Sequence, residues 1–328
     1  MECLVTGGAG FIGTNLVRAL LDRGDRVRVL DNFSTGKREN LRDIDHRLEL
    51  IEGDVRSYHL VREAVEGMDV IFHQAALPSV PRSIRDPITT HEVGVNGTLN
   101  VLQAARDCKV GRVIFASSSS VYGNTEELPK HEKMTPTPLS PYAVSKLSGE
   151  HYCQVFFRLY GLQTVALRYF NIFGPRQDPN SLYSAVIPRF IETISRGDSP
   201  TIFGDGEQSR DFTYVENVVR ANFLAAQAES GVAGEVFNVA CHDRITLNRL
   251  VQALNEGLGT SVAALHAEPR LGDVRHSFAS IEKFRAATGY EPAVAFAEGI
   301  GRTIEWFRAT ILEAFTPNVT HAAGRTDG

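Results

Sequence analysis

A glycine-rich turn near the start of the chain constrains the fold more than any other stretch. Residues 2–6 are typical of a short buried strand, and three glycines follow at regular spacing: Gly7, Gly10 and Gly13. Apolar side chains then recur at helical spacing, at Leu16, Val17, Leu20 and Leu21. The stretch therefore predicts a strand, a tight turn and an amphipathic helix in immediate succession.

A second strand, predicted at residues 26–30, ends in Asp31, which lies 18 residues after Gly13. Glycines let the backbone turn sharply and approach a diphosphate, which rests on the amides at the start of the helix. A carboxylate about 20 residues beyond the turn suits an adenosine ribose and repels a 2′-phosphate. The pattern therefore predicts a site that prefers NAD to NADP. The residues expected to contact the cofactor here are Gly7, Gly10, Phe11, Ile12, Gly13 and Asp31.

Strands and helices keep alternating through the first half of the chain. Further strands are predicted at residues 48–52, 70–73, 112–116 and 164–168, separated by helices near 57–66, 89–108 and 141–160. This alternation predicts an α/β fold with a parallel, doubly wound sheet of the Rossmann type. Ligands of such sheets bind at the carboxyl ends of the strands. The cofactor should therefore also contact Asp54, Val55, Ala75, Ala76, Leu77 and Ser117.

Tyr142 and Lys146 are four residues apart in the predicted helix 141–160, so they lie one turn apart on the same face. An ammonium ~5 Å from a phenol, at an effective dielectric of ~20, favours the phenolate by roughly 3 kcal/mol, or about two pKa units. The pair therefore predicts a tyrosine whose pKa is lowered from ~10 toward neutrality, so that it can act as a base. Ser117 to Ser120 follow the fifth strand, and we expect their hydroxyls to enter the same crevice.

The second half of the chain is expected to build a smaller, interleaved lobe. Residues 171–183 are rich in proline, glycine and asparagine. We predict a NAD-binding domain at 1–174, a substrate lobe at 175–315 and a flexible tail at 316–328, with 213–240 returning to the first domain. Two arginines of the lobe, Arg210 and Arg270, carry guanidinium forks that suit phosphate oxygens.

Five motifs together resemble the extended short-chain dehydrogenase/reductase family, and most of all its UDP-hexose 4-epimerases. They are residues 6–13 (TGGAGFIG), residues 31–36 (DNFSTG), the serines before residues 121–123 (VYG), Tyr142 with Lys146, and residues 168–171 (RYFN). The motifs occur in the family's order and spacing, and the resemblance extends to about residue 312.

The resemblance implies roles for individual residues. The catalytic residues are expected to be Ser118, Tyr142 and Lys146. Further cofactor contacts are implied at Asn32, Ser34, Gly36, Asn96, Tyr142, Lys146 and Tyr169. A UDP-sugar is expected to contact Ser118, Ser120, Tyr142, Asn171, Val186, Phe203, Arg210, Arg270 and Ser277. In this family the helices corresponding to 89–108 and 141–160 pair into a homodimer, so we expect Val101, Leu102, Val155 and Phe156 to take part in such a contact.

The implied reaction is the inversion of C4 of a UDP-hexose. Tyr142 would remove the proton of the 4-hydroxyl while C4 gives a hydride to NAD, and a 4-keto sugar would take the hydride back on its other face. Enzymes specific for glucose and galactose typically have a lysine where this chain has Pro78, and a tyrosine where it has Ser277. Both departures imply UDP-GlcNAc and UDP-GalNAc as substrates, with UDP-Glc and UDP-Gal accepted less well.

Other functions stay open or are disfavoured by particular residues. Sugar-nucleotide 4,6-dehydratases and UDP-glucuronate decarboxylases carry carboxylates in the stretch where this chain has Ser118 to Ser120. A UDP-glucuronate 4-epimerase remains an alternative, because Arg82 or Arg85 could meet a C6 carboxylate. A catalytically silent, nucleotide-sensing protein of the same fold is the alternative from a different class.

Composition sets the remaining expectations. The chain has 328 residues and a formal net charge of -5, which offers no basic face for nucleic acid. Its four cysteines have no spacing typical of a metal site, so no metal is expected. No apolar run approaches the ~20 residues of a membrane span. We therefore expect a cytoplasmic protein that binds neither membranes nor nucleic acid.

Overall fold

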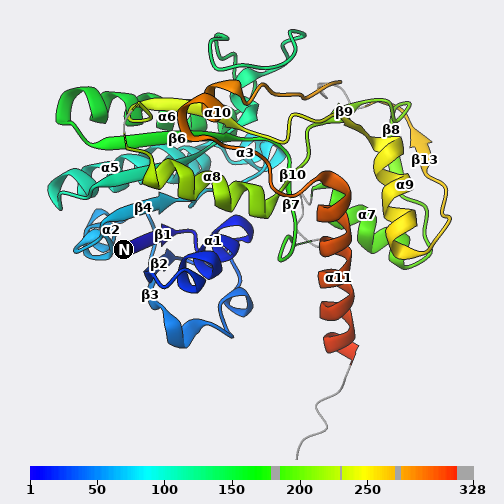
Figure 1. The fold of residues 1–328 in the computed structure, drawn as a ribbon, viewed down its shortest axis with the longest axis horizontal. Coiled ribbons are helices and arrows are strands. Elements are labelled where there is room, and N and C mark those ends of the chain that lie inside the picture. The colour runs from blue at the N-terminus through cyan, green and yellow to red at the C-terminus, as the bar shows by residue number, and fades with distance from the viewer. Residues whose placement is uncertain (179–184, 230, 270–274, 316–328) are drawn as a thin grey trace, which may run out of the picture.

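The computed structural model describes residues 1–178, 185–229, 231–269 and 275–315. A seven-stranded sheet forms the larger part of the molecule (Figure 1), in the order β11-β6-β5-β4-β1-β2-β3. Every neighbouring pair in this sheet is parallel. Its strands are β1 (Glu2–Thr6), β2 (Arg26–Asp31), β3 (Glu49–Glu52), β4 (Val70–His73), β5 (Arg112–Ser118), β6 (Gln163–Tyr169) and β11 (Glu235–Val239).

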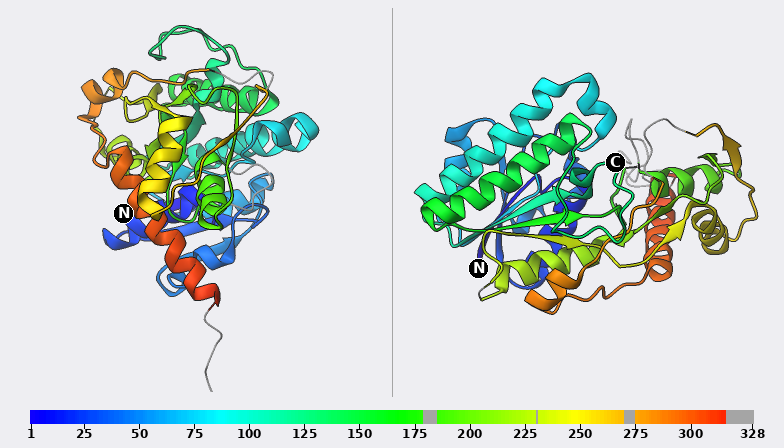
Figure 2. Two further views of the ribbon diagram at one scale, coloured as in Figure 1. Left: turned by 90° about the vertical axis from the view of Figure 1, so that its right-hand side faces the viewer. Right: turned by 90° about the horizontal axis from the view of Figure 1, so that it is seen from above.

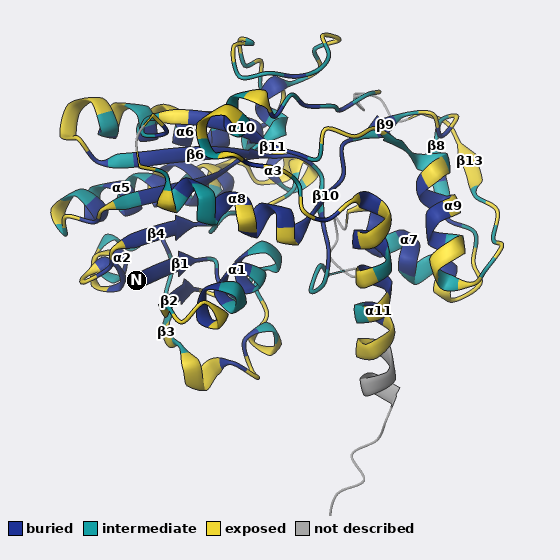
Figure 3. Cartoon of the chain, in the orientation of Figure 1, coloured by how far each residue is buried: buried dark blue, intermediate teal, exposed yellow. Residues whose placement is uncertain are grey.

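Helices cover both faces of the sheet, as the view from above shows (Figure 2). One face packs against α1 (Phe11–Asp22), α8 (Val215–Gln227) and α10 (Glu282–Thr288), the other against α2 (Tyr58–Val65), α5 (Gly97–Asp107) and α6 (Pro141–Tyr160). Side chains alternate along a strand, so Cys3 and Val5 belong to one core and Leu4 to the other. The central strands are accordingly buried along their length (Figure 3). The predicted doubly wound α/β fold is confirmed.

The helix predicted at 89–108 is present as an unbroken helical run over residues 87–107, but a π turn interrupts its α-helical geometry. The structure has α3 (Val80–Arg85) and α4 (Pro87–His91), then a π-helical turn, η3 (Glu92–Asn96), and only then α5. A Cβ at Gly94, inside the π turn, would lie 2.7 Å from the hydroxyl of Ser145 on α6. This close approach of two helices cannot be read from apolar spacing, whereas a π turn is a frequent local adjustment of this kind.

Two strand and helix details correct the sequence predictions. β5 continues to Ser118, so Ser117 and Ser118 end a strand and are not part of a turn after it. Val101, Leu102 and Phe156, expected at a dimer contact, are buried inside the chain, because they cover the sheet. Of the four predicted contact residues only Val155 is exposed.

The smaller lobe lies to one side of the sheet (Figure 1). It contains α7 (Val186–Ser195), α9 (Leu247–Leu258) and α11 (Phe296–Phe315) around an aromatic and aliphatic core. Three separate strand pairs accompany these helices: β7 (Ile172–Phe173) with β10 (Thr213–Tyr214), β9 (Ser209–Arg210) with β12 (Ile245–Thr246), and β8 (Thr201–Phe203) with β13 (Leu265–Ala267). Between β10 and β12 the chain returns to the sheet as α8 and β11.

The remaining short elements are 3-10 turns, namely η1 (Arg38–Asn40), η2 (Asp45–Arg47) and η4 (Ser119–Tyr122). No helix in the described part of the chain has the length and apolar character required to cross a bilayer.

Candidate active site

A large cavity lies along the carboxyl ends of the sheet strands and has a volume of about 1050 Å³. Its walls come from the turns that follow β1 to β5 and from the first turns of α6. The predicted cofactor residues that line it are Gly7, Gly10, Phe11, Ile12, Gly13, Asp31, Asn32, Ser34, Asp54, Val55, Ala75, Ala76, Leu77, Ser117, Tyr142, Lys146 and Tyr169. Segments far apart in the sequence therefore meet in one cavity.

Two predicted cofactor residues do not belong to this wall. Gly36 lies behind it, and a Cβ there would come within 2.9 Å of Ala9 and 3.0 Å of the Asp31 carboxylate. Asn96 is exposed at the end of the π turn, and Val93 lines the cavity in its place. A π turn changes the phase of the helix, so the side chains that face the cavity shift along the chain.

The glycine turn leaves no space for side chains. Gly7 has a positive φ of 72°, and a Cβ at Gly13 would lie 2.1 Å from the carbonyl oxygen of Gly7. Gly10 precedes α1 in an extended conformation and has no side chain that could cap the amides of its first turn. Uncapped amides beside a cavity of this size suit a dinucleotide diphosphate. The residues present therefore fit NAD.

Asp31 holds the glycine turn in addition to lining the cavity. One carboxylate oxygen accepts a hydrogen bond from the Ala9 amide at 2.9 Å, and the other accepts from the Phe33 amide at 2.8 Å. Burial raises the pKa of this carboxyl, and the two amides partly oppose that shift. Each carboxylate oxygen has further lone pairs, so Asp31 can fix the turn and still accept from a ribose hydroxyl.

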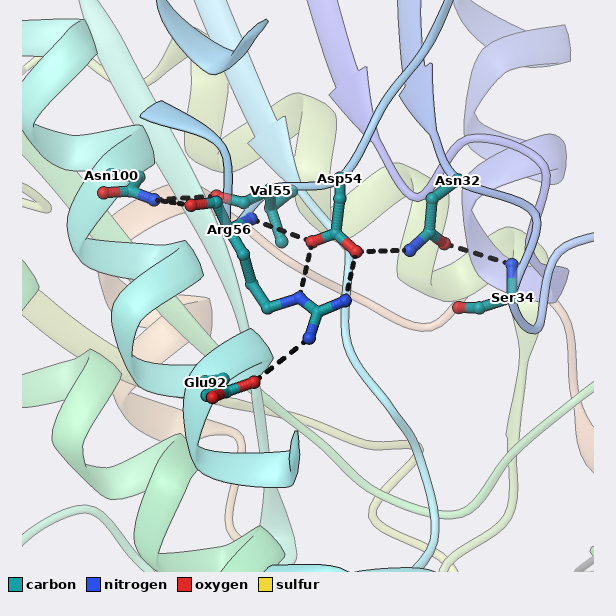
Figure 4. Close-up of polar contacts among 7 residues, drawn as sticks. All are labelled: Asn32, Ser34, Asp54, Val55, Arg56, Glu92 and Asn100. Carbon is teal, nitrogen blue, oxygen red and sulfur yellow. Dashed lines mark hydrogen bonds and ion pairs between the residues drawn. The ribbon is translucent and has the colours of Figure 1, made fainter. Parts of the chain in front are cut away.

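A chain of polar contacts joins the turns after β2 and β3 (Figure 4). The Asn32 amide donates to the Asp54 carboxylate at 2.7 Å, while the Asn32 side-chain oxygen accepts from the Ser34 amide at 3.0 Å. Arg56 donates to both Asp54 oxygens and, at 3.0 Å, to Glu92. This guanidinium holds the pKa of Asp54 down at about 2. Arg56 was not predicted as a site residue, and the one feature of the sequence that points to it is its position just after the third strand.

Ser118, Tyr142 and Lys146 meet where β5 ends. α6 starts after Ser140, whose hydroxyl caps the first turn, so Tyr142 lies at the very start of the helix. The Ser118 hydroxyl faces the Tyr142 phenol closely enough to lower its pKa in part. The Lys146 ammonium lies 5.9 Å from the centre of the Tyr142 ring and donates to the carbonyl of Ala116 at 2.7 Å. The structure thus brings the three predicted catalytic residues together.

The predicted pKa of Tyr142 is wrong for this structure. Burial raises the pKa of the phenol, and the hydrogen bond from Ser118 opposes that shift only in part. Burial also lowers the pKa of Lys146 to about 8, while the Glu150 carboxylate raises it by less. Helical spacing gives the distance between two side chains but not the loss of water around them, and here desolvation dominates.

The remaining serines of the run have separate environments. The Ser117 hydroxyl donates to the buried Glu150 carboxylate at 2.5 Å. The Ser118 oxygen also accepts from the Ser120 amide at 3.2 Å. The Ser120 hydroxyl oxygen is buried and has no hydrogen-bond partner within the described residues. Ser120 does not line the large cavity, and neither does Ser118.

A second cavity of about 240 Å³ adjoins the first. Four residues predicted to contact UDP line it: Asn171, Val186, Phe203 and Arg210. Ala185 belongs to the walls of both cavities, which therefore meet at the start of α7. A ligand whose nucleotide occupies the second cavity could therefore extend its other end into the large cavity.

The polar residues of this second wall are held by the backbone of the lobe. Asn171 has a positive φ of 38°, and its amide donates to the carbonyl of Asp211 at 3.2 Å. The Arg210 guanidinium donates to the carbonyls of Ser209 and Arg275 at 2.9 and 3.2 Å. Ser277 is buried and lines neither cavity, although its amide donates to the carbonyl of Ser209. The other predicted phosphate ligand, Arg270, lies outside the described residues.

Comparison with known families agrees with this geometry. The model described as "NAD dependent epimerase/dehydratase family" matches residues 3–240. The chain belongs to this family. The predicted family resemblance and the predicted cofactor, NAD, are thereby confirmed.

Three relatives of this epimerase/dehydratase family member illustrate the similarity. A UDP-N-acetylglucosamine 4-epimerase from Methanobrevibacter ruminantium, solved with UDP-N-acetylmuramic acid, shares 40% identity at a TM-score of 0.90, covering 94% of this chain and 98% of that one. A UDP-glucose 4-epimerase from Thermus thermophilus, solved with NAD, shares 39% identity at a TM-score of 0.85, covering 94% and 99%. The UDP-glucose 4-epimerase of Mycolicibacterium smegmatis is 39% identical, covering 94% of this chain and 99% of its own.

Proposed function

We propose that the protein inverts C4 of a UDP-hexose through a 4-keto intermediate. The observation that carries the proposal is the grouping of Ser118, Tyr142 and Lys146 at the end of β5, beside a cavity that fits NAD. The adjoining second cavity supports the same reaction, because a substrate spanning both would place its sugar next to Tyr142.

Each of the three residues has a distinct task in this proposal. Tyr142, as the phenolate, accepts the proton of the sugar 4-hydroxyl. Ser118 lies beside Tyr142, so it can hold the same sugar oxygen and relay the proton. Lys146 favours the phenolate by its charge, against the burial that raises the pKa of the phenol. When bound, NAD supplies the hydride acceptor and donor, so no net redox change results.

The residues around the catalytic group favour epimerisation over elimination or decarboxylation. Removing water or carbon dioxide from the sugar calls for an additional carboxylic acid or carboxylate beside the substrate. Residues 118–120 are all serines. The buried carboxylate nearby, Glu150, is held by Arg168 and Ser117.

We place UDP in the second cavity. Phe203 and Val186 offer apolar surface for the uracil ring, and Asn171 and Arg210 offer donors for the ribose and diphosphate oxygens. The hexose would then point through the junction at Ala185 toward Tyr142.

For the sugar we propose UDP-GlcNAc and UDP-GalNAc, with UDP-Glc and UDP-Gal as poorer substrates. Pro78 lines the large cavity, so this position of the wall carries no lysine side chain. The side chain of Ser277 is small, which leaves volume for an N-acetyl group if the residue faces C2 of the sugar.

A second candidate, UDP-glucuronate, is favoured by one observation. Arg82 and Arg85 of α3 both line the large cavity, and a guanidinium there can pair with a C6 carboxylate. Initial rates on UDP-GlcNAc, UDP-Glc, UDP-GlcA and their C4 epimers test both candidates. We expect the acetylated pair to give the highest kcat/KM, and a clear preference for UDP-GlcA would replace our first choice with the second.

We also propose a homodimer formed through α4 and α6. Val144, Val155 and Leu159 leave an exposed apolar stripe on α6, and Ile88 is exposed on α4. Such a stripe suits the self-complementary contact of a two-fold dimer. Light scattering at micromolar concentration should give twice the 36.1 kDa of one chain, whereas a particle of monomer mass would reject the dimer.

A further inference from the structure

A buried ion pair lies one helical turn beyond the catalytic lysine. Arg168 of β6 donates two hydrogen bonds, at 2.8 and 2.7 Å, to the carboxylate of Glu150 on α6. The two side chains are 4% and 2% exposed. In every other ion pair of the described residues, at least one partner reaches solvent. Buried pairs add little net stability, so this one calls for another explanation.

The pair is tied to the catalytic end of β5 by adjacent contacts. The Ala116 carbonyl accepts from the Lys146 ammonium at 2.7 Å, and the hydroxyl of the next residue, Ser117, donates to Glu150 at 2.5 Å. Ser118, the following residue, faces Tyr142 and lowers the pKa of its phenol in part. Three consecutive residues of β5 therefore contact three residues of α6 spaced one turn apart: Tyr142, Lys146 and Glu150.

We propose that Glu150, held by Arg168, is a positioning residue that keeps Lys146 charged and fixes Ser118 against Tyr142. The proposal rests on the catalytic roles given above to these last three residues. Glu150 itself has no part in the proton transfer, because Ser117 and Arg168 occupy its oxygens.

The groups around Lys146 leave Glu150 as its source of negative charge. From α6 it faces Tyr142 and Glu150, and from β5 the ring of Phe115 at 5.1 Å. His73 faces it from β4 and is neutral, since burial lowers the pKa of this imidazole to about 3. Arg168 of β6 lies beyond Glu150 and is a cation as well. Among these groups, the carboxylate of Glu150 is the one that raises the pKa of Lys146.

The sign of the effect follows from this arrangement. Burial has already lowered the pKa of Lys146 to about 8, close to working pH. Removing the carboxylate charge lowers it further, so Lys146 becomes neutral at a lower pH. The alkaline limb of the pH profile of kcat/KM should then move toward lower pH, by about one unit for a charge one turn away.

The test is the pH profile of Glu150→Gln and of the double variant Glu150→Gln with Arg168→Met. The single variant leaves a buried guanidinium without its partner and is expected to lower the melting temperature markedly. The double variant removes both charges and restores the melting temperature, yet its alkaline limb stays shifted by about one unit. Glu150→Asp, which keeps the charge, should keep the limb close to that of the wild type.

Two controls make the outcome decisive. Glu298→Gln removes the carboxylate of an exposed pair with Arg302 on α11 and should leave the profile unchanged. A folded double variant with the wild-type alkaline limb, or a Glu298→Gln variant shifted by the same amount, would overturn the inference. Lys146→Met tests the underlying function separately: if it keeps wild-type turnover, the proposed catalytic group is wrong, whatever Glu150 does.

Discussion

The two adjoining cavities are built on different kinds of backbone. The walls of the larger one come from turns that end consecutive parallel strands, and most of its residues belong to short local motifs such as residues 7–13 and 31–36. The walls of the smaller one come from the crossing after β6, from α7 and from strands that pair in twos. Its residues lie between Asn171 and Phe212, apart from Leu247.

This difference indicates which walls of the two cavities can change independently of each other. The cofactor wall is fixed by the sheet, because the ends of parallel strands necessarily meet at one edge. The substrate wall depends on contacts between short strands, such as that of Ser209 with Thr246, and each can change without disturbing the sheet. Changes in one cavity should therefore leave binding in the other largely intact.

The largest effect is expected at Tyr142, which lines the larger cavity. Tyr142→Phe removes the proposed base but neither wall, so kcat should fall by about 10³-fold or more while NAD and UDP bind as before. Turnover of UDP-GlcNAc measures kcat, and calorimetric titration with UDP measures UDP binding. Retention of more than a few percent of activity would contradict the role of Tyr142.

Ser277→Tyr tests the proposed preference for acetylated sugars. A phenol ring would overlap an N-acetyl group, and overpacking of a rigid site costs several kcal/mol, so turnover of UDP-GlcNAc should fall by about 10²-fold or more. Turnover of UDP-Glc and UDP-Gal should be spared. Equal loss for both pairs would mean that Ser277 does not face the sugar, in keeping with its place outside the two cavity walls.

Gly13→Ala should damage the cofactor cavity alone. The added Cβ would lie 2.1 Å from the Gly7 carbonyl, so the turn must shift, and a cost of about 2 kcal/mol corresponds to roughly 30-fold weaker NAD binding. UDP affinity, measured in parallel, serves as the internal control. A matching drop in UDP affinity would show that the two walls are coupled.

Arg210→Met is the counterpart in the substrate cavity. Loss of a charged hydrogen bond to a diphosphate costs about 1.5 to 2 kcal/mol, which predicts a rise in KM of roughly 10- to 30-fold with a smaller change in kcat. The affinity for NAD should be unchanged. A fall in kcat with an unchanged KM would place Arg210 at the reacting sugar and not at the diphosphate.

The smallest effect is expected for Asp54→Asn, which alters the polar chain beside the cofactor cavity. The pKa of Asp54 is lowered to about 2, so its stabilisation is present above the unfolded value of ~3.9 and is lost as pH falls toward 2. Arg56 is 43% exposed, and screening limits the pair to about 0.5 kcal/mol. Urea unfolding should show that Asp54→Asn is less stable than the wild type by this amount at pH 7 and by less at low pH. A loss of stability that grows as the pH falls would contradict the expected sign.

Much of the cofactor cavity could be predicted because its signals are local. Gly7, Gly10 and Gly13 are needed by the turn itself, and Asp31 follows at the distance that one helix and one strand require. Gln74 and Arg176 also line the cavity but were missed, since neither belongs to a motif with a fixed spacing. The pKa of Tyr142 was wrong for a related reason: the distance between helical neighbours is local, whereas burial is not.

The order of strands and helices, the glycine turn and the pairing of Tyr142 with Lys146 could all be predicted from the amino-acid sequence, because each depends on residues within a few turns of one another. Only the folded chain shows that Glu150 meets Arg168 one helical turn beyond Lys146, and that Val93 and not Asn96 of the π turn lines the cavity. These arrangements depend on how strands and helices pack across the sheet. No spacing along one chain segment specifies which distant side chains share a desolvated space.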